Sequence, residues 1–151
     1  MIEVFETHTA STQAAGLRGR ARVAYDRFLD ELAHSGCAAL GYRVTGPEPL
    51  PRLCVKHLRG ADRVVVAFPS PRSVWVLLVG PHDDDPGRNL YDVLYEMAGV
   101  RPKLSEKRMK PPCCSDDTRT PPLADDDLID DLVQRARALA RARRRGPGDL
   151  G

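Results

Sequence analysis

The sequence predicts an α+β fold with a small, mostly antiparallel sheet, N-terminal helices, one helix after the last strand and a C-terminal helical extension. Three β-like runs, 53–58, 63–68 and 74–79, follow one another with only short breaks, as antiparallel strands do, and the last two are rich in β-branched and aromatic residues. Helical periodicity precedes them in residues 18–34 and follows them in 89–97. At 151 residues, the chain is long enough for one domain with a real core.

The elements before the three runs are predicted from local patterns. Residues 2–5 alternate apolar and acidic side chains, which indicates a first strand. A short helix is expected over 12–17, capped by Thr9 or Ser11. The next helix has one apolar face, and Ser35-Gly36 ends it. After it a connection runs to residue 52, with room for a brief strand at 39–44.

The second half of the chain begins with a hairpin. Its loop is expected at residues 69–72, and the strand at 74–79 is apolar on both faces, so it should be the central strand. We predict one domain over 1–101, a Pro-rich linker over 102–124 and a terminal helix over 125–145. That helix packs either on its own domain or on a second copy. Alternatively, the acidic part of the tail lies across the basic face of the sheet and masks it.

Bulk properties favour a cytoplasmic protein. No apolar run is long enough to span a bilayer, and the N-terminus lacks the pattern of a signal peptide. The four cysteines, Cys37, Cys54, Cys113 and Cys114, could form two bridges, but without an export signal reduced thiols are expected. The charge of residues 1–110 is mildly basic, which permits contact with nucleic acid without requiring it.

Polar side chains at the ends of the predicted strands are the candidates for chemistry. Arg63 opens an apolar strand, on which alternation places it on one face with Val65 and Ala67, and Val64 and Val66 on the other. Its guanidinium either extends to the solvent or clamps a phosphate. His82 follows the strand at 74–79 and is either a neutral loop residue or a proton-transfer group. Tyr91 and Tyr95, four residues apart on a helix, can both face the sheet as core residues.

A zinc site is the competing chemical hypothesis, because Cys54 and His57 lie three residues apart and Cys113-Cys114 is nearby. In an extended strand, however, residues three apart point to opposite faces, and the chain has no CxxC pair. We therefore expect neither a metal site nor a cofactor. Lys56 and Arg59 read as solvated charges at a strand edge, and Arg88 lies close enough in sequence to reach back toward His82.

The order of these elements and motifs resembles the RelE/ParE toxin superfamily over residues 1–98. The resemblance depends on the helical RVAYDRFLDELAHSG, on Leu58-Arg-Gly followed by Asp62-Arg-Val-Val-Val-Ala-Phe, and on Val76-Leu-Leu-Val-Gly-Pro-His followed by Leu90-Tyr-Asp-Val-Leu-Tyr. Three aspartates at 83–85 and a tail beyond Arg101 depart from the family pattern.

The resemblance implies an endoribonuclease that cleaves mRNA on the ribosome, by attack of a ribose 2′-OH on the adjacent phosphate, and that a cognate antitoxin controls. Arg63 would stabilise the phosphate, His82 would transfer the proton, and Tyr91 would orient the substrate. Lys56, Arg59 and Arg88 are then the candidate RNA-binding residues. The alternative is a non-enzymatic module of the same fold that binds a protein, either an antitoxin or gyrase. Both the ribonuclease and the protein-binding module could form a homodimer.

Overall fold

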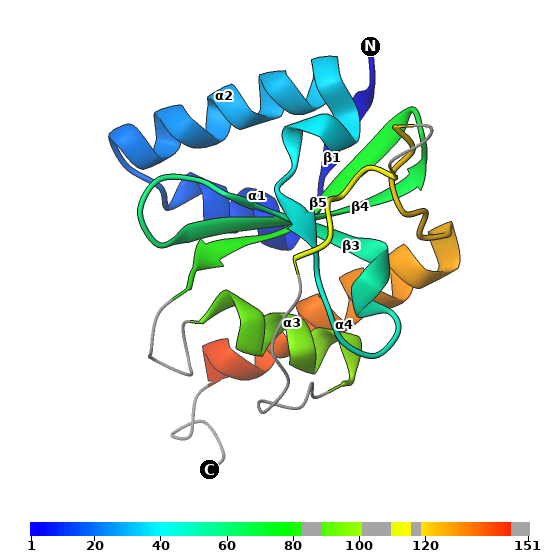
Figure 1. Ribbon diagram of the computed structural model, residues 1–151. Helices are drawn as coiled ribbons and strands as arrows, with labels where there is room; N and C mark the ends of the chain where they lie inside the picture. Colours follow the sequence, from blue (N-terminus) through cyan, green and yellow to red (C-terminus); the bar gives the residue numbers. More distant parts are fainter. Residues whose placement is uncertain (83–88, 101–109, 116–118, 146–151) are drawn as a thin grey trace.

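The computed structural model describes residues 1–82, 89–100, 110–115 and 119–145 and confirms an α+β architecture (Figure 1). A mostly antiparallel sheet has the strand order β1-β5-β4-β3-β2, and only the β1–β5 pair is parallel. The strands are β1 (Glu3–Glu6), β2 (Tyr42–Arg43), β3 (Leu53–His57), β4 (Asp62–Ser70) and β5 (Ser73–Pro81).

Two helices cover each face of the sheet in the described part of the chain. The α-helices are α1 (His8–Ala15), α2 (Arg20–Ser35), α3 (Leu90–Ala98) and α4 (Asp126–Arg145), with short 3₁₀ turns at Gly36–Ala39 and Leu50–Arg52. One hydrophobic cluster joins α1 and α2 to one face, and a second joins α3 and α4 to the other. The terminal helix thus packs on its own domain, with Leu132 fully buried.

The side chains of strand β4 alternate between the two hydrophobic clusters on either face of the sheet. Val64 and Val66 lie in the cluster under α2, whereas Val65 and Ala67 lie in the cluster under α3. This confirms the predicted faces of the strand. The expectation that residues 74–79 form the central strand was wrong by one place, because β2 extends the sheet beyond β3 and leaves β4 in the middle.

Helix α1 begins earlier than its sequence predicts. Thr7, rather than Thr9 or Ser11, is the N-cap: its Oγ1 accepts from Ala10 N at 3.0 Å and donates to Leu77 O at 3.2 Å. A hydroxyl that can also bond to the sheet is the better cap, because one side chain then satisfies polar groups of two elements. The side chain of Gln13 then accepts from Val79 N at 2.8 Å and fixes α1 along β5.

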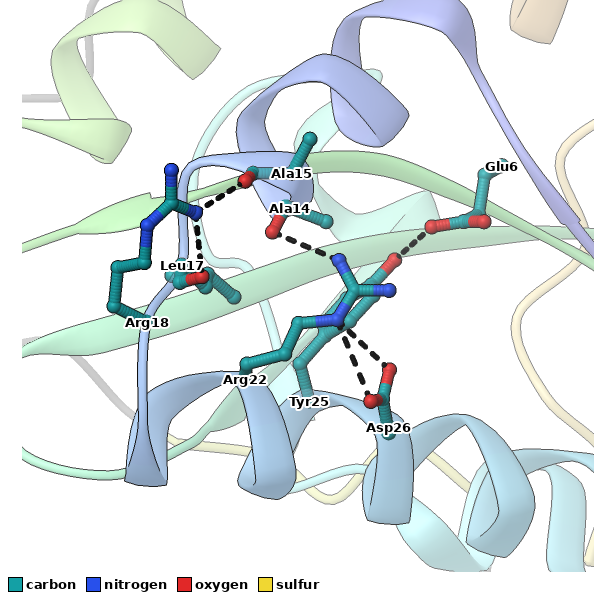
Figure 2. Close-up of polar contacts among 8 residues, drawn as sticks. All are labelled: Glu6, Ala14, Ala15, Leu17, Arg18, Arg22, Tyr25 and Asp26. Carbon is teal, nitrogen blue, oxygen red and sulfur yellow. Dashed lines mark hydrogen bonds and ion pairs between the residues drawn. The ribbon is translucent and has the colours of Figure 1, made fainter.

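Arginine side chains join α1 to α2 (Figure 2). Arg18 Nη1 donates to Ala15 O at 2.7 Å, and Arg22 Nη1 donates to Ala14 O at 3.0 Å, so both satisfy carbonyls at the end of α1. On the next turn, Tyr25 donates to Glu6 Oε2 at 2.5 Å. Burial, and then this hydrogen bond, raise the pKa of Tyr25, so the phenol stays a donor that links α2 to β1.

The cysteines correct a second expectation. They form two disulfides, Cys37–Cys114 and Cys54–Cys113, where reduced thiols were predicted. The Cα–Cα distances are 5.3 and 5.8 Å, which suit such bonds. The prediction followed compartment rules and could not anticipate that the fold places adjacent cysteines between the 3₁₀ turn after α2 and strand β3.

The described parts of residues 102–124, the predicted linker, pack on the domain. Pro112 bridges to Tyr42 on β2, and Leu123 bridges to Phe68 on β4. Arg43 N donates to Pro111 O at 2.8 Å, and Cys113 is buried. This segment therefore covers the outer side of β2 and leads into α4. Among the described helices, none has both the length and the apolar character that crossing a bilayer requires.

Candidate functional site

The candidate site begins at the turn between β3 and β4. Leu58 N donates to Asp62 O at 2.9 Å and closes the turn, in which Gly60 adopts a φ of +63° that favours glycine. The register then pairs His57 with Arg63 across the strands. Directly paired residues point to the same face. Imidazole and guanidinium thus stand side by side, on the face that α3 covers.

The next strand brings His82 to the same place. Arg63 pairs with Gly80 of β5, near the end of that strand. Two residues later, His82 N donates to Ala61 O at 2.8 Å, which holds the backbone of His82 against the β3–β4 turn. The sequence Gly80-Pro81-His82 therefore ends the strand and presents the imidazole at its end.

Tyrosine side chains form the floor. Asn89 caps α3 by accepting from Tyr91 N at 3.1 Å, and the ring of Tyr91 lies edge-on to His82 with centroids 4.8 Å apart. Tyr42 of β2 reaches in from the other side: its Oη lies 3.0 Å from Tyr91 Oη and 3.1 Å from His57 Nε2. The two phenols and the imidazole thus form one hydrogen-bonded row.

Together these groups line a hollow of about 240 Å³, called here the hairpin hollow. His57 and His82 are exposed, Arg63 is half-buried and Tyr91 is buried. The described lining residues include no carboxylate; they are Tyr42, Val44, Thr45, His57, Arg63, His82, Tyr91, Tyr95 and Lys110. Lys110 Nζ stands 5.4 Å from the centroid of the Tyr42 ring. The hollow is therefore positively charged on its described sides, which suits an anion.

The guanidinium of Arg63 is oriented by hydrogen bonds that use only some of its donors. Its Nη1 donates to Gly60 O and to Asp62 O, each at 3.0 Å. Its Nε is buried and has no hydrogen-bond partner among the described residues. A buried donor without an acceptor is costly, typically about 1–3 kcal/mol. The two carbonyls orient the guanidinium and leave Nη2 without an acceptor among the described residues.

The pKa values of two groups in the hollow are shifted in opposite directions. Burial, and then the nearby charges of Arg63, Lys110 and His82, lower the pKa of His57 below 6.5. Burial, and then the hydrogen bond to Tyr42, raise the pKa of Tyr91. At neutral pH, therefore, His57 is a neutral imidazole that can accept a proton, and Tyr91 is a phenol that keeps its proton.

Of the residues predicted from the sequence, Arg63, His82 and Tyr91 meet in the hollow. Lys56 and Arg59 do not: they line a different groove, beside α2. Arg88 and the aspartates at 83–85 lie outside the described residues. Within those limits, no cluster of three or more metal-binding side chains occurs.

Sequence reasoning missed three residues of the hollow as site residues: His57, Tyr42 and Lys110. A signal existed for His57, because a hairpin that turns about Gly60 places residues 57 and 63 opposite each other. No local pattern marked Tyr42, which lies in a strand of only two residues, or Lys110, which arrives from the segment fixed by the disulfides.

No protein-family model, curated protein or solved structure matches this chain. The functional argument therefore depends on the geometry of the hollow.

Proposed function

We propose that this protein is a ribonuclease of the RelE/ParE toxin class, which cleaves single-stranded RNA by attack of a ribose 2′-OH on the adjacent phosphate. One observation carries the proposal: two histidines and an arginine face a single hollow with a floor of phenols. This reaction needs a base, an acid and a cation for the phosphate, and those are the groups present. At about 240 Å³ the hollow suits a ribose and its phosphate, with the bases outside.

The neutral His57 is the base. Its imidazole takes the proton of the 2′-OH as the 2′-oxygen bonds to phosphorus. The bond from phosphorus to the 5′-oxygen breaks, and His82 acts as the acid that gives a proton to that leaving oxygen. The products are a 2′,3′-cyclic phosphate and a 5′-hydroxyl. Arg63 faces the phosphate, where a planar fork of donors matches the oxygens that gain charge. It cannot be the base, because arginine keeps its proton at accessible pH.

Tyr42 and Tyr91 position the base. A tyrosine hydroxyl 3.1 Å from His57 Nε2 fixes the orientation of the imidazole ring. Tyr91 in turn fixes Tyr42, and its ring edge supports His82. The two phenols come from different elements, β2 and α3, and each contacts one histidine: Tyr42 contacts His57, and Tyr91 contacts His82.

The class assignment is supported by the order of the elements. One strand, two helices, an antiparallel run of strands and a helix after the last strand follow in the order that the resemblance implies, with the short β2 added. A ribosome carrying mRNA and a cognate antitoxin are the partners that belong to this class. A cytoplasmic address belongs to the same proposal. The two disulfides weigh against that address, because disulfides persist mainly in oxidising compartments.

The second candidate is a protein-binding module without activity, for an antitoxin or gyrase. It is favoured by a groove of about 600 Å³ between α1, α3 and α4, whose lining includes the apolar Val93 and Leu139. A protein that keeps its whole biological effect after His57→Ala and His82→Ala would belong to this second class.

Product analysis tests the ribonuclease proposal. Oxidised protein is incubated with an end-labelled single-stranded RNA, alone and on programmed ribosomes. Cleavage is expected to leave 2′,3′-cyclic phosphate ends, and a single 2′-deoxy nucleotide should block the cut at its own position. His82→Ala should slow cleavage by about 10²–10⁴-fold, because it removes a proton donor. The matched control is His34→Ala, an exposed histidine on α2 outside the hollow. No cleavage in either setting, or full cleavage by the His82 variant, rejects the proposal.

The pH dependence of cleavage should identify the base. A base works only when deprotonated, and the pKa of His57 is lowered from 6.5. The acid limb of the activity, as kcat/KM, should therefore have its midpoint below pH 6.5. In His57→Ala that acid limb should disappear together with most of the rate. If the acid limb of kcat/KM for the wild-type protein has its midpoint above pH 6.5, the base is a group other than His57.

A further inference from the structure

A second positively charged surface lies beside the hairpin hollow. It is a groove of about 730 Å³ between α2 and the end of the β3–β4 hairpin, called here the α2 groove. Its walls carry four cations, Arg20, Arg27, Lys56 and Arg59, against one acid, Glu31. In Figure 1 the beginning of α2 stands above the hairpin at the same end of the molecule.

The four cations of the α2 groove have no partners in the described part of the chain: none forms an ion pair or a side-chain hydrogen bond there. Some other arginines do pair, each with an acid four residues away: Arg22 with Asp26, Arg52 with Glu48 and Arg135 with Asp131. The α2 groove therefore gathers four cations along one depression without a described acid that neutralises any of them.

The start of α2 adds to the positive potential. A helix N-terminus carries partial positive charge and usually attracts acidic residues in its first turn. The first turn of α2 has no acid, and instead begins with Arg20 after the uncapped Gly19. A cation beside the partial positive charge of the helix N-terminus is unfavourable in the free protein. A bound anion would offset this repulsion.

His57 connects the two sites, because it lines both the hairpin hollow and the α2 groove. Its neighbour Lys56 points to the opposite face of β3, so the positive surface continues around the end of the hairpin from one site to the other. Within the groove Val23 is 56% exposed, which offers an apolar contact between the cations.

We propose that the α2 groove binds the phosphate backbone of the RNA strand that flanks the cleaved nucleotide. A single strand with its scissile phosphate on Arg63 would pass His57 and lay its neighbouring phosphates against Arg20, Arg27, Lys56 and Arg59. This inference rests on the proposed function. It specifies the substrate as an extended single strand of several nucleotides, read through its charge rather than through its bases.

Length-dependent binding tests the inference. A fluorescent RNA of twelve nucleotides and a dinucleotide, both 2′-O-methylated to prevent cleavage, are titrated with protein at several salt concentrations. Arg20→Gln with Arg27→Gln should weaken binding of the long RNA on the order of tenfold and reduce its salt slope by about 1.4, the value for two lost phosphate contacts. Binding of the dinucleotide should not change. The control pair, Arg137→Gln with Arg141→Gln on α4, removes the same charge from exposed positions elsewhere.

The outcomes separate the two proposals. If the groove variant binds the long RNA with the affinity and salt slope of the wild type, the proposal that the α2 groove binds RNA is wrong. An equal loss in the control pair would also overturn it, because the effect would then be one of net charge. If the groove variant binds the long RNA more weakly but the wild-type protein cleaves no RNA, the α2 groove is an RNA-binding site and the ribonuclease proposal is wrong. Thermal unfolding of each variant checks that its fold is intact.

Discussion

Arg63→Ala is expected to slow RNA cleavage by about 10²–10³-fold, the usual effect of removing one charged donor from a developing oxyanion. The guanidinium is oriented by two carbonyl groups that accept from Nη1, and Nη2 has no acceptor among the described residues, so the donors of Nη2 are the ones a phosphate would use. Substrate affinity should fall less than the rate, because the charge on the phosphate oxygens grows in the transition state.

The rate is measured with saturating RNA in single turnovers, so that chemistry is separated from binding. Arg63→Lys should recover only part of the lost rate, because an ammonium keeps the charge but lacks the planar fork. Arg72→Ala, at the exposed far end of the β4–β5 hairpin, is the matched control and should cleave normally. If Arg63→Ala cleaves as fast as Arg72→Ala, the guanidinium takes no part in the reaction.

Loss of the disulfides should have the largest effect on stability. Cys37–Cys114 and Cys54–Cys113 span sequence separations of 77 and 59 residues. Chain entropy alone assigns about 4 kcal/mol to closing a loop of either size. The loops overlap, so the two contributions do not simply add. Even one is a large part of the roughly 5–15 kcal/mol by which domains are usually stable. Reduction should therefore leave a marginally stable protein.

Urea unfolding with and without a thiol-free reductant measures this loss. Cys37→Ser with Cys114→Ser and Cys54→Ala with Cys113→Ala remove the bridges one at a time, and alanine suits the second pair because both of its cysteines are buried. Reductant should no longer act on a variant that lacks both bridges, which serves as the control. An unchanged urea midpoint on reduction, or four titratable thiols in the native protein, would show that the bridges do not form.

The sequence allowed the sheet face of each β4 residue to be predicted, because alternation on a strand depends only on local geometry. That is why Arg63 and Val65 could be assigned to one face in advance. The position of His82 at a strand end was equally local. The structure places Arg63 and His82 together with Tyr91 around one hollow, an arrangement that depends on the strand register and on the packing of α3 rather than on local sequence.

What could not be predicted was set by long-range contacts. Tyr42 belongs to a strand of two residues, inside the brief strand expected at 39–44, but its place beside His57 depends on pairing with β3. Lys110 is separated in sequence from every strand and is placed by two disulfides, whose pairing a single sequence does not determine. The cap at Thr7 was missed because its hydroxyl bonds to Leu77, on a strand seventy residues away.

The segment bonded through Cys113 and Cys114 also has a protective role. Strand β2 would end the sheet with free backbone groups, but Pro111 and Pro112 lie along Tyr42 and Arg43 and occupy that side. Exposed strand edges recruit other chains, and proline, which has no amide hydrogen, makes a poor template for further pairing. Releasing the segment would uncover this rim, so molecules with opened bridges should associate through it and precipitate as their concentration rises.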